Sequence, residues 1–148
     1  QSNFNQKLWG NMEGRVRSQV CADTLYVVTG AWFDGERDSS IALQTNDRSG
    51  NRCPIPTDYF KILLRTKSGN TRRSVADIDD PSQLKAIGFW FKHRDTGSDT
   101  SITSEYCMSV ADIERMTGNR FDFFPMLDEK VAAEVKSQCD PSAWGITR

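Results

Sequence analysis

A four-residue recurrence of apolar side chains near the start of the chain constrains the fold more than any other feature. The recurring residues are Phe4, Leu8, Met12, Val16 and Val20, and Trp9 lies beside them in the sequence. Residues four apart share one face of an α-helix, so the spacing predicts a helix over residues 4–20 with one buried stripe. Ser2 or Asn3 is expected to cap its start. Gly10 and Gly14 weaken the helix, which therefore needs a tertiary surface to pack against.

Three β-rich segments follow this helix, over residues 24–33, 58–66 and 84–93. The first opens with a continuous apolar run, which indicates a strand buried on both faces. Polar residues 46–52 and acidic residues 74–83 separate the segments, and both stretches are expected to be loops.

Two short helices are expected near the end of the chain. Ser109 and Asp112 have the spacing of a capping box, and Gly118 suits the left-handed position that ends a helix. Residues 128–138 begin acidic and carry Lys136 near their end, as a helix dipole prefers. The whole pattern predicts an α+β fold, a mostly antiparallel sheet with helices packed against it, in a single domain over residues 1–148.

Composition limits the classes of function. The 148 residues suffice for one domain with a core, and no apolar run reaches the length of a membrane span. The formal net charge is −1, so any contact with nucleic acid must come from a local patch of charge.

Four widely spaced cysteines suit two disulfides and an oxidising, secreted or periplasmic location. Three pairings are open, and so is the alternative of free thiols. The residues concerned are Cys21, Cys53, Cys107 and Cys139.

One side of the predicted first helix carries residue types that can bind a metal ion or a phosphate, namely Asn5, Glu13 and Arg17. On a continuous α-helix, Asn5 and Glu13 lie within about 80° of each other but roughly 12 Å apart along the axis. Asn5 is therefore expected to bind a cation directly and Glu13 to act through its waters, an arrangement that suits Mg²⁺. Arg17 can hold the Glu13 carboxylate or reach a phosphate. An ordinary solvent-facing helix is the alternative.

The segment Asn5-Gln-Lys-Leu-Trp9-x-x-x-Glu13-x-x-x-Arg17 resembles the metal-binding helix of the DNA/RNA non-specific endonucleases, the ββα-metal nucleases. Further segments resemble the same family in the expected order, over about residues 4–127. They are Leu25-Tyr-Val-Val-Thr-Gly30, Ile55-Pro-x-x-Tyr-Phe-Lys61, Ala86-Ile-Gly-Phe89, Ser109-Val-Ala-Asp-Ile-Glu-x-x-Thr-Gly118 and Phe123-Phe-Pro125.

The resemblance implies a secreted nuclease that hydrolyses phosphodiester bonds in DNA and RNA without regard to sequence or sugar. In such enzymes an Asn holds Mg²⁺, with Mn²⁺ or Ca²⁺ as alternatives, and a histidine in an Asp-Arg-Gly-His motif activates water. By motif position, Asn5 matches the metal ligand, Glu13 the carboxylate that orders metal-bound water, and Arg17 a basic residue near the phosphate.

This sequence departs from the family in having no Asp-Arg-Gly-His. Its one histidine, His93, follows the metal helix and is expected to be an exposed residue at a strand end. The chain is therefore expected to be the C-terminal part of a ββα-metal nuclease, inactive without the N-terminal half of the same protein. The alternative is a noncatalytic module on this fold that binds nucleic acid or protein.

Overall fold

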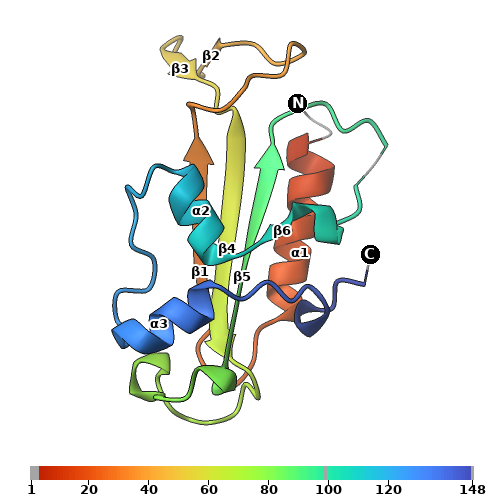
Figure 1. Cartoon of the computed structure of the whole chain (residues 1–148). Coiled ribbons are helices and arrows are strands. Elements are labelled where there is room, and N and C mark those ends of the chain that lie inside the picture. Colours follow the sequence, from red (N-terminus) through yellow and green to blue (C-terminus); the bar gives the residue numbers. More distant parts are fainter. Residues whose placement is uncertain (1–3, 99, 148) are drawn as a thin grey trace.

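A four-stranded antiparallel sheet organises the computed structural model, which describes residues 4–98 and 100–147 (Figure 1). The strand order in this sheet is β1-β4-β5-β6. The elements are η1 (Phe4–Trp9), α1 (Gly10–Ser18), β1 (Tyr26–Trp32), β2 (Gln44–Asn46), β3 (Arg52–Pro54), β4 (Asp58–Thr66), η2 (Val75–Asp77), η3 (Pro81–Gln83), β5 (Leu84–Lys92), η4 (Ser104–Tyr106), β6 (Cys107–Met108), α2 (Val110–Met116), α3 (Glu129–Lys136) and η5 (Ser142–Trp144). The predicted α+β class is confirmed. The expected cap at Ser2 or Asn3 lies outside the described residues.

The central strand β4 contributes side chains to a separate core on each face of the sheet. Phe60, Ile62 and Leu64 join the core that contains residues of α2 and α3. Leu63 joins the core that contains Phe4, Leu8 and Met12 of the first helix. Successive side chains of a strand point to opposite faces, so the apolar β4 is buried on both.

The edge strand β1 departs from its predicted burial. Its residues alternate between half-buried and exposed, so the expectation of burial on both faces is wrong. Val28 packs against the core that contains α2 and α3, whereas Val27 on the opposite face is 43% exposed. The first helix packs on Leu63 of β4 and on Ile87, Phe89 and Phe91 of β5, and leaves this face of β1 open.

The two C-terminal helices begin as the sequence predicts. Ser109 and Asp112 form the capping box of α2, and Gly118 follows the helix with φ of 69°. The side chain of Asp128 accepts hydrogen bonds from the backbone N–H groups of Lys130 and Val131 at the start of α3.

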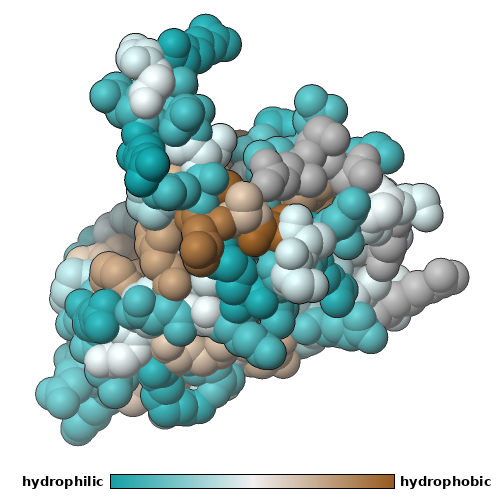
Figure 2. All heavy atoms as spheres, turned by 90° about the horizontal axis from the view of Figure 1, so that it is seen from above, coloured by the Kyte–Doolittle hydropathy of each residue, from teal (hydrophilic) through white to brown (hydrophobic). Residues whose placement is uncertain are grey.

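The short ribbon of β2 and β3 was not predicted, since residues 46–52 read as loop. It extends beyond one end of the main sheet, at the top of Figure 1. Seen from above in Figure 2, the ribbon is a hydrophilic projection with an apolar area at its base. Residues 42–52 are all exposed, so no apolar pattern marks the ribbon in the sequence.

All four cysteines are free, so the prediction of two disulfides is wrong for this structure. Cys21 lies against Gly69, just beyond the end of β4, whereas Cys53 lies in β3 beyond the other end. The nine residues of β4 span roughly 30 Å, far more than a disulfide bridges. The thiols of Cys21, Cys53 and Cys107 instead donate to nearby carbonyl oxygens. The secreted or periplasmic location stays a prediction.

Within the described part of the chain, no helix has both the length and the apolar character that crossing a membrane requires.

A buried carboxylate fastens the segment after α1 to the turn after β4. Asp23 is 8% exposed and accepts hydrogen bonds from the hydroxyls of Thr66 and Thr71. The backbone N–H groups of Thr71 and Arg72 also donate to it, each over 2.8 Å. The Thr66 and Thr71 hydroxyls, followed by these backbone donors, hold the pKa of Asp23 well below its ordinary value.

We expect Asp23→Asn to remove a pH-dependent part of the stability. Because the pKa of Asp23 is depressed on folding, its contribution is present above the ordinary carboxyl pKa and is lost as pH falls below it. The free energy of unfolding should therefore be higher for the wild type near pH 7, and the difference should shrink steadily as pH falls below the ordinary carboxyl pKa. Urea denaturation across this range measures the difference. The control is Asp77→Asn, at an exposed residue. If the free energies of unfolding of the wild type and Asp23→Asn changed in parallel with pH, the depressed pKa of Asp23 would be contradicted.

The free thiols are expected to differ in reactivity. Desolvation is the main cause that raises the pKa of the half-buried Cys107 to about 12, whereas Cys139 is exposed. Since the thiolate is the reactive form, iodoacetamide at pH 8 should label Cys139 well before Cys107 in the folded protein. After denaturation without reductant, mass spectrometry should count four labelled thiols. A count of two or none would restore the disulfides.

Candidate functional site

The residue that matches the metal ligand lies in a π-helical turn. Phe4–Trp9 is π-helix and Gly10–Ser18 is α-helix, so the prediction of one α-helix over 4–20 is wrong in detail. The helix ends two residues early, and Val20 is 70% exposed. A π-turn is wider than an α-turn and often marks a functional site.

Aromatic packing anchors this turn to the sheet. Phe4 is 1% exposed, and its ring lies 5.3 Å from that of Tyr59 and 5.1 Å from that of His93, centroid to centroid. The ring of Trp9 lies 5.6 Å from Tyr59 and 5.7 Å, edge-on, from Phe91. The exposed Asn5 is thus flanked by two residues that the core holds in place.

Asn5 lines a cavity of about 320 Å³ between the helix and the open face of β1. The other residues that line it are Phe4, Trp9, Thr29, Gly30, Ala31 and Tyr59. Glycine is required at position 30, because a Cβ there would lie 2.1 Å from the Phe60 ring. The cavity therefore joins the predicted metal ligand to the Leu25–Gly30 segment, which the sequence had linked only by resemblance.

A lysine that the sequence analysis gave no role lies beside this cavity. Lys61 of β4 is 6% exposed, and its Nζ donates to Thr29 Oγ1 over 2.8 Å. The same Nζ lies 4.6 Å from the centroid of the Trp9 ring. Burial lowers the pKa of Lys61, and the carboxylate of Glu13 acts against this, so Glu13 and Lys61 attract each other. The signal in the sequence that could have marked this residue is a lysine within the otherwise apolar run Tyr59–Leu64.

Arg17 and Glu13 are both exposed and are not joined to each other. The described residues contain five ion-pair contacts, and none of them involves either side chain. Of the two roles predicted for Arg17, holding the Glu13 carboxylate is therefore not observed. The guanidinium of Arg17 is exposed, and contact with a phosphate is the predicted role that remains.

His93 is buried, so the expectation of an exposed strand-end residue is wrong. It is 4% exposed beneath Phe4 and Tyr59, and its Nδ1 lies 3.0 Å from the carbonyl oxygen of Pro56. A carbonyl oxygen only accepts, so Nδ1 is the donor in this contact. Nε2 is buried without a partner in the described structure. His93 does not line the cavity and cannot act there as a base.

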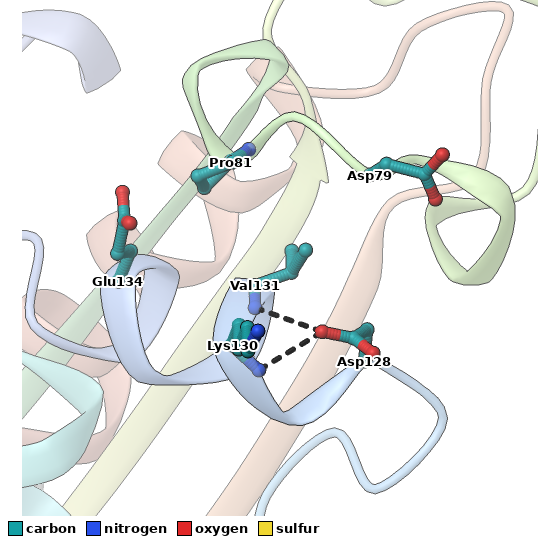
Figure 3. Close-up of a pocket in the computed structure, with 6 residues that line it drawn as sticks. All are labelled: Asp79, Pro81, Asp128, Lys130, Val131 and Glu134. Carbon is teal, nitrogen blue, oxygen red and sulfur yellow. Dashed lines mark hydrogen bonds between the residues drawn. The ribbon is translucent and has the colours of Figure 1, made fainter.

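A second hollow of about 300 Å³ lies against α3, away from Asn5 (Figure 3). Three acidic residues line it, namely Asp79, Asp128 and Glu134. Asp128 is engaged as the cap of α3, as the dashed lines in Figure 3 show. No group of three potential metal-binding His, Cys, Asp or Glu side chains occurs among the described residues.

The donors near Asn5 fit a cation that keeps most of its water. Asn5, which has one side-chain oxygen, lines the cavity, and the carboxylate of Glu13 lies farther along the same helix. Mg²⁺ dehydrates reluctantly and is often held by one or two protein oxygens. A cluster of several carboxylates is not needed for such a site.

Comparison with known proteins identifies one family. A family model described as DNA/RNA non-specific endonuclease matches residues 1–130. No curated protein matches the chain.

We expect Phe4→Ala to loosen the turn that carries Asn5. Removing a fully buried Phe side chain typically costs about 3–5 kcal/mol, because a cavity replaces its contacts. Urea denaturation should show this loss in the free energy of unfolding. Phe33→Ala, at a residue 47% exposed, is the matched control and should cost less than about 1 kcal/mol. Equal losses in the two variants would show that Phe4 is not an anchor.

Proposed function

The chain belongs to the DNA/RNA non-specific endonuclease family, and we propose that it carries the metal-binding helix of a Mg²⁺-dependent endonuclease. The observation that supports this is the placement of Asn5. Its amide lines a cavity at the sheet surface, between two aromatic residues that the core fixes. The same cavity contains a hydroxyl, that of Thr29, supported by a buried cation.

In this proposal Asn5 holds Mg²⁺ directly through its side-chain oxygen, and Glu13 orders water bound to the ion. Mn²⁺ or Ca²⁺ would meet the same oxygen donors. Held there, the metal would supply Lewis-acid stabilisation of negative charge on the phosphate and the leaving oxygen. Asn5 fixes where the ion sits, because Phe4 and Trp9 restrict its backbone. Glu13 is exposed, and its carboxylate attracts the ammonium of Lys61.

The substrate in this proposal is the sugar–phosphate backbone of DNA or RNA. Arg17 is exposed on the same helix as Asn5 and is free of ion pairs in the described structure, so it can contact a phosphate. Backbone contacts position a protein on nucleic acid but carry no sequence information directly. Cleavage without sequence or sugar preference follows from such contacts.

The general base in this proposal comes from outside the sequence. His93 is buried and does not line the cavity, and no other histidine occurs in the chain. We propose that an Asp-Arg-Gly-His segment in the N-terminal half of the same protein supplies the base. The isolated chain is then expected to be inactive.

The lack of a histidine on the cavity also favours a second candidate, a noncatalytic module that binds nucleic acid or protein on the same fold. The coding sequence upstream of Gln1 distinguishes the two. An Asp-Arg-Gly-His motif there supports the enzyme, and its absence supports the module.

We expect Asn5→Ala in the full-length protein to abolish Mg²⁺-dependent plasmid cleavage, because the direct ligand is lost. Glu13→Gln should reduce cleavage by about 10–100-fold, the range typical of residues that orient a metal's shell. A time course of supercoiled plasmid on agarose, with Mg²⁺ and with EDTA, measures both.

Asn11→Ala is the matched control, since this amide on the same helix donates to the Thr100 carbonyl and does not line the cavity. It should cleave at the wild-type rate. Wild-type turnover in Asn5→Ala would refute the metal assignment. Cleavage by the wild type that EDTA leaves unchanged would refute metal dependence itself.

A further inference from the structure

We propose that the Thr29 hydroxyl donates a hydrogen bond to a phosphate oxygen of the nucleic acid, and that Lys61 is the positioning residue that orients it. This inference deepens the proposed function and rests on it. Neither residue belongs to the motif that suggested the metal site. Their contacts to each other and to the cavity carry the argument.

The sheet register places the two residues side by side. Thr29 of β1 is the direct antiparallel partner of Lys61 of β4, so both side chains project from the same face. On this face the helix covers β4 but leaves β1 open. Lys61 is consequently 6% exposed, beneath Trp9, while Thr29 is exposed and lines the cavity with Asn5.

Hydrogen-bond roles decide which way the Thr29 hydroxyl donates. A lysine ammonium has three donors and no acceptor, so Thr29 Oγ1 must accept in the 2.8 Å bond from Lys61 Nζ. The O–H of Thr29 remains to donate, and no acceptor for it occurs among the described residues. A hydroxyl that accepts from a cation is also a better donor, because the bond polarises it. Thr29 therefore offers the cavity a polarised donor.

The charge behind this hydroxyl indicates an anion as its partner. The buried ammonium of Lys61 is held by the face of the Trp9 ring and by attraction to Glu13. Burying a cation is costly, and this one makes a single hydrogen bond within the described structure, which goes to Thr29. A phosphate can direct one of its oxygens to a cation held by Asn5 and another to the hydroxyl of Thr29. The backbone phosphate of DNA or RNA meets this description.

Binding without cleavage tests the proposal on the chain as it stands. The probe is a fluorescein-labelled single-stranded DNA of 12 nucleotides, titrated in EDTA and low salt and followed by anisotropy. We expect Thr29→Val to weaken binding by about tenfold, which is what one hydrogen bond to a charged group contributes. Thr29→Ser keeps the hydroxyl and should bind within about twofold of the wild type. Thr24→Val, at an exposed threonine just before β1, is the control and should leave affinity unchanged.

A double-mutant cycle tests the positioning role of Lys61. Lys61→Met should weaken binding, and the double variant with Thr29→Val should be no weaker than Thr29→Val alone. A residue with only a structural role would instead add its own loss to that of Thr29→Val. If Lys61→Met does not fold, as judged by circular dichroism, the comparison of Val with Ser at position 29 still decides the hydroxyl contact.

Each result has one consequence. Wild-type affinity in Thr29→Val overturns the inference and leaves the proposed function intact. Losses that add in the double variant overturn the role of Lys61. A wild-type chain that binds no DNA, with or without Mg²⁺, overturns the proposed function and this inference together.

Discussion

The packing of the Phe4 and Trp9 rings on β4 and β5 supports the whole candidate site. These rings contact Tyr59, Phe91 and His93, and together they seal one core of the sheet. Aromatic pairs at these separations stabilise a structure beyond the area that they bury. Among the described residues, no hydrogen bond or ion pair of its own attaches the side chain of Asn5 to the sheet. Its position at the cavity follows from its neighbour Phe4 and from Trp9 one turn on.

The position of the first helix over the sheet has a second effect. Because the helix covers β4 and β5, the corresponding face of β1 is left open, and the cavity forms at the boundary. The open face is also why Val27 and Thr29 are exposed although they belong to an apolar run. The same boundary buries Lys61, whose charge would be solvated on an uncovered strand. An open face, a buried cation and a cavity thus have one cause.

Away from the candidate site, a largely buried lysine joins two elements through ion pairs. Lys136 at the end of α3 contacts Glu114 of α2 at 2.7 Å and Asp122 at 2.6 Å. The carboxylate of Glu114 also accepts from the backbone N–H of Phe123. This network joins α2 and α3 on the face opposite the candidate site. A notable contrast is that Lys136 is balanced by two carboxylates, whereas Lys61 has a hydroxyl and an aromatic face.

The sequence by itself determined the features that depend on local chemistry. The strand over 58–66, the capping box at Ser109 and a short helix with an acidic start near residue 128 all follow from short-range patterns and were predicted correctly. The resemblance of the chain to the DNA/RNA non-specific endonucleases likewise needed no coordinates, and the family comparison confirms it.

Tertiary structure alone decided where each element packs. The burial of His93, the open face of β1 and the place of Lys61 depend on which strand the first helix covers, and no local pattern encodes that choice. Whether any of the four thiols can pair likewise depends on distances between elements, which the spacing of cysteines along the chain does not give. The residue type sets the chemistry of a side chain, whereas its exposure to solvent and its contacts depend on how the elements pack.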